Sequence, residues 1–164
     1  MNRSAIISEC GTYRYLLGRA WDISRPLLTF VMLNPSTADA EEDDPTIRKC
    51  IGFAERLGYG GIVVANLYAY RATDPKDLRK AGYPVGPLND EYIAEAARRG
   101  SNNVICAWGS NARGLARPAE VLATLRKCST KPMALRLSAD GIPSHPLMLP
   151  YSCTLQPLGG ISSC

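Results

Sequence analysis

Metal-binding and disulfide-forming residues are scarce and scattered in this sequence. The 164 residues include one histidine and six cysteines, and no two cysteines form a C-x-x-C pair. Cys50 and Cys106 lie within apolar segments, which is typical of buried thiols. Zinc and iron–sulfur sites need clustered ligands, and disulfide frameworks are typical of short secreted chains. We therefore expect no metal site and no disulfide framework.

Long apolar runs are also missing. No stretch reaches the ~18 uninterrupted apolar residues of a membrane span, and the opening residues MNRSAIISECG lack the apolar segment of a signal peptide. We expect a cytoplasmic protein without a membrane partner. Because a domain commonly has about 100–150 residues, we expect one monomeric domain over residues 1–158, followed by a disordered tail at 159–164.

Several common catalytic motifs are absent. The sequence contains no G-x-x-x-x-G-K-[ST], no G-x-G-x-x-G after a strand, no H-E-x-x-H and no G-x-S-x-G. These absences argue against a P-loop enzyme, a dinucleotide enzyme, a zinc protease and an α/β-hydrolase. A Ser–His–Asp arrangement through His145 stays open, although no serine lies on a recognisable elbow.

The charge is unevenly distributed. Lysine and arginine number 19 and the acids 15, giving a net charge of +4. Five of the acids lie in one run, DAEEDD at residues 39–44, so the rest of the chain is more basic than the net charge indicates. A basic body suits a polyanion such as nucleic acid, but a solvated surface with an acidic loop explains the pattern equally well.

Strands are predicted from apolar runs and from alternation. Residues 5–7 and 12–20 resemble an N-terminal β-hairpin that covers a sheet edge. Continuous apolar runs at 27–33, 61–68 and 103–108 are typical of strands buried on both faces. A short final strand is expected at 133–137.

Helices are predicted from caps and periodicity. Asp44 and Pro45 begin one helix, because aspartate is a favoured N-cap and proline fits the first turn, and Gly58 ends it. Asp74 and Pro75 begin a short helix in the same way, and further helices are expected at 89–99 and 118–127. The alternation predicts an α/β fold, a three-layer sandwich with a mostly parallel central sheet.

Polar side chains follow the predicted buried strands. The first strand leads into residues 34–37, the second ends near Asn66, the third leads into residues 109–113, and residues 144–146 follow the last. Ligands of open α/β sheets bind beyond the carboxyl ends of the strands. The sequence therefore predicts a site at this edge.

Two of these segments resemble motifs of the uracil-DNA glycosylase superfamily. FVMLNPS at residues 30–36 resembles its first motif, in the form found in mismatch-specific thymine/uracil glycosylases, and HPL at 145–147 is similar to its second motif. VANL at 64–67 and CAWGSNA at 106–112 match the strands between, so the likeness covers about residues 27–150. The nearest overall likeness is to the domain of unknown function 1643 family, through LNPSTAD, DPT, NLY and HPL. The chain also resembles defence glycosylases that act on hypermodified phage bases.

The expected catalytic residues are Asn34 and His145, which lie in the two motifs of the resemblance, and Asp44, which is added on chemical grounds. Asn34 is expected to hold the attacking water, because hydrolysis of an N-glycosidic bond needs a positioned water rather than a strong nucleophile. His145 is expected to donate a hydrogen bond to the departing base. Asp44 and Asp43 compete for the water-positioning role, and a carboxylate there would also stabilise a cationic sugar, although capping of the helix explains Asp44 as well.

Further residues are assigned to substrate and DNA. The expected substrate-binding residues, with the tyrosines stacking on a flipped base, are Pro35, Ser36, Thr37, Asn66, Tyr68 and Tyr70. The expected DNA-phosphate contacts are Ser110, Asn111 and Arg113. The acidic run is expected to form a pocket wall that accepts hydrogen bonds from a sugar on the base.

The resulting hypothesis is a monofunctional DNA glycosylase that needs no cofactor and leaves an abasic site. No lysine lies within the motifs, so a Schiff-base route has no evident nucleophile. The first expected base is glucosylated hydroxymethylcytosine in phage DNA, followed by uracil or mismatched thymine, in an anti-phage or repair role. The alternatives are a non-catalytic nucleic-acid or nucleotide-binding module and a phage base-modification enzyme of the same fold.

Overall fold

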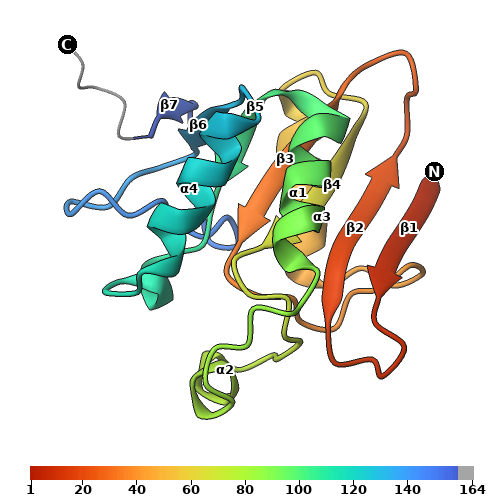
Figure 1. The fold of residues 1–164 in the computed structure, drawn as a ribbon. Helices are drawn as coiled ribbons and strands as arrows, with labels where there is room; N and C mark the ends of the chain where they lie inside the picture. The colour runs from red at the N-terminus through yellow and green to blue at the C-terminus, as the bar shows by residue number, and fades with distance from the viewer. Residues whose placement is uncertain (159–164) are drawn as a thin grey trace.

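The computed structural model describes residues 1–158 and shows a seven-stranded sheet between two layers of helices (Figure 1). The strands are β1 (Asn2–Ile7), β2 (Arg14–Ala20), β3 (Leu27–Met32), β4 (Gly61–Asn66), β5 (Gly100–Cys106), β6 (Lys131–Ala134) and β7 (Gln156–Pro157). The helices are α1 (Pro45–Arg56), α2 (Pro75–Lys80), α3 (Asn89–Arg99) and α4 (Arg117–Lys127), with a 3₁₀ turn η1 (Ser110–Ala112). The predicted α/β class is confirmed.

The sheet has a parallel centre and antiparallel edges. Its order is β1-β2-β4-β3-β5-β6-β7, in which β4, β3, β5 and β6 run parallel. The hairpin of β1 and β2 adds antiparallel to β4, and β7 adds antiparallel to β6. The predicted hairpin at a sheet edge is therefore confirmed, whereas the predominantly parallel character holds for the central strands alone.

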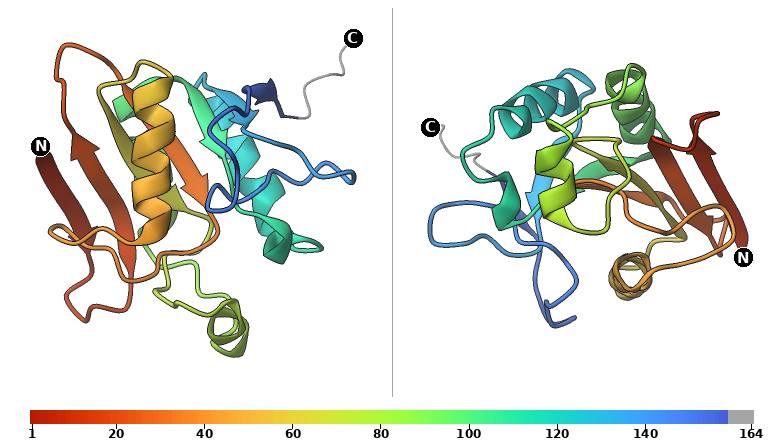
Figure 2. Two further views of the ribbon diagram at one scale, coloured as in Figure 1. Left: turned by 180° about the vertical axis from the view of Figure 1, so that it is seen from behind. Right: turned by 90° about the horizontal axis from the view of Figure 1, so that it is seen from below.

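The chain reverses its direction of winding at β3. From β3 it passes through α1 to β4 on one side, and it then returns through α3 to β5 on the other side. Figure 2 shows α1 on one face of the sheet and α3 and α4 on the opposite face. In open α/β sheets, a crevice forms beyond the carboxyl ends of two neighbouring strands whose connections run to opposite sides of the sheet. The ends of β3 and β5 flank that crevice here.

Two apolar cores lie on the two faces of the sheet. On the α1 face, Phe30 of β3 packs with Ile47 and Phe53 of α1. On the other face, Val31 of β3 packs with Ile93 of α3 and other apolar side chains of that face. Adjacent residues of β3 thus point to opposite cores, which explains why this strand is apolar throughout.

The helix predictions agree closely with the structure. The Asp44 side chain accepts a hydrogen bond from the backbone N–H of Ile47, and Asp74 caps α2 in the same way through Lys76. Helix α3 begins and ends as predicted, and α4 begins one residue before the predicted start. Within residues 1–158, no helix has the length and apolar character to cross a membrane.

Two strand predictions need correction, and one strand was not predicted. The final predicted strand, 133–137, is instead β6 at Lys131–Ala134, because its pairing partners in β5 end at Ile105. Strand β7 was not predicted, since two residues carry no periodicity. Strand β5 begins at Gly100 rather than at residue 103. The absence of a Cβ at Gly100 leaves space for the Thr29 hydroxyl. The predicted tail at 159–164 lies outside the described residues.

The two cysteines predicted to be buried are both fully buried. Cys50 lies in the core beneath α1 and Cys106 in the core beneath α3 and α4. Burial raises the pKa of both thiols well above the ordinary value, because a thiolate is poorly solvated there. Within residues 1–158 every cysteine is a free thiol.

Candidate functional site

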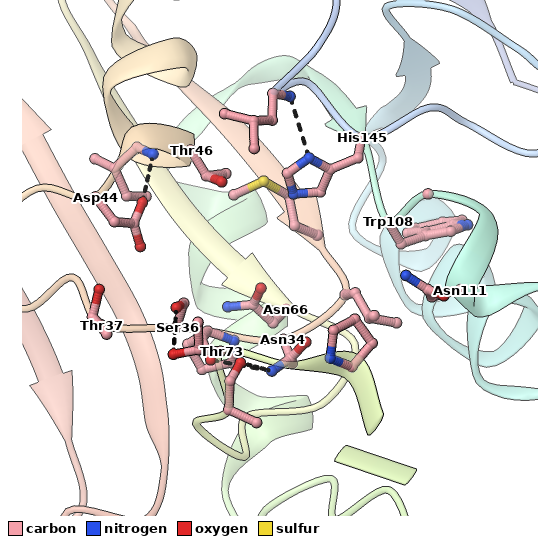
Figure 3. Close-up of a pocket in the computed structure, with 18 of the residues that line it drawn as sticks. Asn34, Ser36, Thr37, Asp44, Thr46, Asn66, Thr73, Trp108, Asn111 and His145 are labelled. Carbon is pink, nitrogen blue, oxygen red and sulfur yellow. Dashed lines mark hydrogen bonds between the residues drawn. The ribbon is translucent and has the colours of Figure 1, made fainter. Parts of the chain in front are cut away.

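A cavity of about 460 Å³ lies beyond the carboxyl ends of β3, β4 and β5, beside the first turn of α1. Figure 3 shows Asp44 and His145 on one side of it, and Ser36, Asn34 and Asn66 on the other. The volume falls within the ~300–1,000 Å³ typical of small-molecule sites. The predicted residues that line it are Asn34, Pro35, Ser36, Thr37, Asp44, Asn66, Ser110, Asn111 and His145.

The Asn34 amide is fixed in one orientation. Its Nδ2 donates to the carbonyl oxygens of Ala72 (2.8 Å), Pro35 (3.1 Å) and Tyr70 (3.4 Å). Because three carbonyls face the nitrogen, the other amide atom must be the oxygen. No hydrogen bond from residues 1–158 reaches that Oδ1, so it remains an acceptor in the cavity wall.

The Asn66 amide is buried without a partner. Asn66 ends β4 and lines the cavity, with 1% of its surface exposed. Neither its Nδ2 nor its Oδ1 has a hydrogen-bond partner in the part of the chain that the structure describes. A buried amide left in this state costs free energy, and such groups in native proteins have a reason. A ligand with one donor and one acceptor would satisfy both atoms.

Asp44 caps helix α1 and also lines the cavity. Its Oδ1 accepts from Ile47 N at 2.9 Å and its Oδ2 from Ala38 N at 3.4 Å, so its function as a helix cap is confirmed. The side chain nevertheless lines the cavity and is nearly buried. Its negative charge therefore acts on any ligand there, while its oxygens are largely occupied.

His145 presents its neutral form to the cavity. Its Nδ1 accepts a hydrogen bond from the Leu147 backbone at 3.2 Å, which leaves the proton on Nε2. Burial lowers the pKa of His145, although Asp44 opposes this effect. The imidazole is therefore uncharged at neutral pH and can still donate one hydrogen bond.

Gly109, just after β5, allows His145 to approach. Its φ of +82° lies in the left-handed region, and a Cβ there would lie 3.2 Å from the His145 Cβ. The Gly109 N–H also donates to the Pro143 carbonyl at 2.9 Å, which holds the two segments together. A glycine at this point of the chain is thus required by both conformation and space.

The cavity-lining residues that were not assigned from the sequence include one arginine, two threonines and one tryptophan: Arg14, Thr46, Thr73 and Trp108. Arg14 is 2% exposed, and its Nη1 donates to the Ala38 carbonyl at 3.0 Å. Its Nε is buried without a partner in residues 1–158. The available signal was an arginine in a predicted strand of the hairpin, where burial of a charged side chain is rare unless it is paired.

The acidic run is not the predicted wall of the cavity. Asp43 forms an ion pair with the buried Arg19 at 2.8 Å, and Arg19 also donates to the carbonyls of Asp39 and Glu42. The Asp39 carboxylate accepts from the backbone of the next turn. These contacts hold the run against the hairpin, and Asp44 is its only member among the cavity-lining residues identified in 1–158.

Three predicted site residues lie outside the cavity wall as described. Tyr68 is buried against Tyr83, and Tyr70 contributes its carbonyl to Asn34 rather than its ring to the cavity. Arg113 is exposed and forms an ion pair with Asp140 at 2.7 Å. The structure therefore offers Trp108, rather than the two tyrosines, as an aromatic surface in the cavity.

The fold and the site together define an α/β protein with a cavity, lined in part by polar side chains, where the direction of winding reverses. The model of the family described as protein of unknown function (DUF1643) matches residues 14–147, and the chain belongs to this family. No curated protein and no solved structure matches the chain. Within residues 1–158, no three His, Cys, Asp or Glu side chains gather as a metal ion would need.

Proposed function

We propose that this protein is a monofunctional DNA glycosylase that hydrolyses the bond between a base and its sugar. The observation that carries the proposal is the convergence of an open amide oxygen on Asn34, an Nε2–H donor on His145 and an unpartnered amide on Asn66 in one cavity. The likeness of residues 30–36 and 145–147 to glycosylase motifs supports the same reaction.

Asn34 positions the attacking water. Its free Oδ1 accepts a hydrogen bond from the water, while three carbonyl contacts hold the amide still. The bond between C1′ and the base nitrogen breaks, and its electron pair moves onto the base. The water oxygen bonds to C1′, and the proton that the water loses balances the proton that the base gains on release. The nearby Asp44 charge stabilises the cationic sugar.

His145 and Asn66 act on the base. Nε2–H of His145 donates to an oxygen on which negative charge develops, and the Asn66 amide pairs with a donor and an acceptor on the ring edge. The lining residues include no lysine, so the chemistry proceeds through water rather than through a Schiff base. We assign contacts with the DNA backbone to Ser110 and Asn111, which lie at the start of η1 and line the cavity.

A glucosylated hydroxymethylcytosine remains the first substrate to test, with uracil and mismatched thymine after it. The hydroxyl side chains of Ser36, Thr37, Thr46 and Thr73 line the cavity, and Ser36 and Thr73 lie 3.2 Å apart. Hydroxyl groups are both donors and acceptors, which suits the hydroxyls of a sugar. They supply the polar wall that the acidic run does not.

Alkaline cleavage of DNA tests the proposal. Duplexes carrying one glucosylated hydroxymethylcytosine, one uracil or one mismatched thymine are incubated with the protein, and abasic sites are converted to breaks by alkali. We expect breaks in at least one duplex with the wild type and none with Asn34→Ala. Asn102→Ala is the matched control, because Asn102 is exposed at the opposite end of β5. Binding without breaks in any duplex would favour a non-catalytic module.

A further inference from the structure

Strand β2 carries two buried arginines whose surroundings differ. Arg19 donates to the Asp43 carboxylate and to the carbonyls of Ser4, Gly18, Asp39 and Glu42. Arg14 makes one side-chain hydrogen bond within residues 1–158, from Nη1 to the Ala38 carbonyl, and its Nε is unpartnered. Arg19 serves the acidic run, whereas Arg14 lines the cavity.

Arg14 keeps its positive charge despite its burial. Its pKa is lowered to about 10, chiefly by desolvation. Asp44 opposes this shift, the neighbouring cations Arg71 and Arg19 add to it, and Cys50 opposes it weakly. The group therefore remains a cation at neutral pH. Among residues 1–158, no carboxylate comes within ion-pair distance of it. A buried cation without a contacting anion is costly to the folded state.

We propose that Arg14 is a catalytic residue that binds the departing base and holds the negative charge the base acquires. The inference rests on the proposed function. When the bond between C1′ and the base nitrogen breaks, the electron pair spreads over the ring nitrogens and carbonyl oxygens of the base. An N–H of Arg14 donates to one of these atoms, while Nε2–H of His145 donates to another. The cavity thus favours a ring that can carry negative charge.

This role explains why a cation is retained in the cavity wall. A charged hydrogen bond strengthens as its acceptor becomes more negative, so Arg14 stabilises the broken-bond state more than the intact nucleotide. In the proposed reaction, the charge of Asp44 stabilises the sugar cation. Both charges that form are therefore matched by an opposite charge from the protein.

Binding of free bases tests the inference without any need for catalysis. Isothermal titration calorimetry compares 5-fluorouracil, whose ring N–H is unusually acidic, with uracil from neutral to mildly alkaline pH. Arg14 stays charged across this range, and His145 stays neutral because its pKa is lowered. We expect the wild-type affinity for 5-fluorouracil to rise ~10-fold or more as the base ionises, a size typical of a charged hydrogen bond.

Variants of Arg14 show whether this side chain causes the rise in affinity for 5-fluorouracil with pH. Arg14→Met should remove the pH dependence and Arg14→Lys should keep part of it, with thermal melting used to confirm that each variant folds. If Arg14→Met fails to fold, Arg14→Gln replaces it. The proposal is overturned if the folded neutral variant shows the wild-type pH dependence, if the wild-type affinity does not change with pH, or if the wild type binds neither base at millimolar concentration.

Kinetics separate this inference from the proposed function. On the duplex that the wild type cleaves best, Arg14→Met should lower the single-turnover rate ~10²-fold and leave the DNA dissociation constant within a few-fold. An unchanged rate would overturn the role of Arg14 and leave the glycosylase intact. If the wild type releases no base from any duplex, the proposed function fails, and the binding of ionised base still decides whether Arg14 recognises an anionic ring.

Discussion

The cavity and the acidic run both lie beside the first turn of α1, yet their polar groups differ in whether they have hydrogen-bond partners. In the acidic run, Arg19 and Asp43 pair with each other and the remaining donors meet backbone carbonyls. In the cavity, atoms of Arg14 and Asn66 are buried without partners. A satisfied network stabilises the chain, whereas buried groups without partners cost free energy, and we propose that a ligand satisfies those at the cavity. From the sequence, the acidic run was assigned to the cavity wall because it follows Asn34 in the chain. Position in the chain does not show whether a polar group already has a partner.

The largest effect is expected from Asn34→Ala. Removing the water anchor should lower base release at least ~10³-fold while DNA affinity stays within a few-fold, because no phosphate contact is lost. Single-turnover cleavage and fluorescence anisotropy measure the two quantities. The substitution also removes three hydrogen bonds to carbonyls, so thermal melting must show a folded variant. Wild-type rates in the variant would exclude Asn34 as the anchor.

His145→Ala should slow base release by ~10²–10³-fold, the usual effect of losing one preorganised donor. His145→Gln is the companion variant, because an amide can still donate. Burial lowers the pKa of His145 from 6.5, so the unfolded chain binds its proton more readily than the folded chain. The free energy of unfolding should therefore fall as the pH drops below about 6.5. Chemical denaturation should show a weaker fall in His145→Gln.

The two buried arginines should differ in their effect on stability. Arg19→Met should lower the free energy of unfolding by about 3 kcal/mol, because it leaves Asp43 and several carbonyls without their partner. Arg14→Met should lower it by less than about 1 kcal/mol, because loss of one hydrogen bond is offset by removal of an uncompensated charge. Urea denaturation of both variants measures the difference. Equal losses would remove the distinction between the two regions.

A smaller effect is expected from separating the two roles of Asp44. Asp44→Asn keeps an acceptor for Ile47 N and should cost less than about 1 kcal/mol in stability, whereas Asp44→Ala should cost about 1–2 kcal/mol. If the carboxylate charge stabilises a cationic sugar, Asp44→Asn should still slow base release ~10-fold or more. Full activity in a stable Asp44→Asn variant would leave Asp44 as a cap alone.

The sequence predicted most of the fold because local signals and burial agreed. Apolar runs marked β3 and β4, and Asp44-Pro45 marked the start of α1 with its cap. Strand β7 was not predicted, because Gln156 and Pro157 form a strand only by pairing with Ala134 and Met133 of β6. Such pairing depends on tertiary contacts that no short window of sequence contains.

The candidate site was predictable where residues follow a strand directly. Asn34 and Asn66 were placed by the rule for carboxyl ends of parallel strands. Arg14 was missed because β2 is an antiparallel neighbour, and its side chain reaches the cavity only through the arrangement of the hairpin beside β4. Tyr70 was assigned to the cavity from its proximity to a strand end, yet its backbone, not its ring, serves Asn34.

Detection of the released base tests the central claim most directly. The wild type and Asn34→Ala are incubated with DNA carrying glucosylated hydroxymethylcytosine, uracil or mismatched thymine, and mass spectrometry of the small-molecule fraction identifies any free base. Borohydride in a parallel reaction traps any Schiff base. The account predicts that the wild type releases an intact free base, leaves an equal amount of abasic sites and forms no borohydride-trapped adduct, and that Asn34→Ala releases none. Intact DNA in every wild-type reaction, or a trapped protein–DNA adduct, would contradict it.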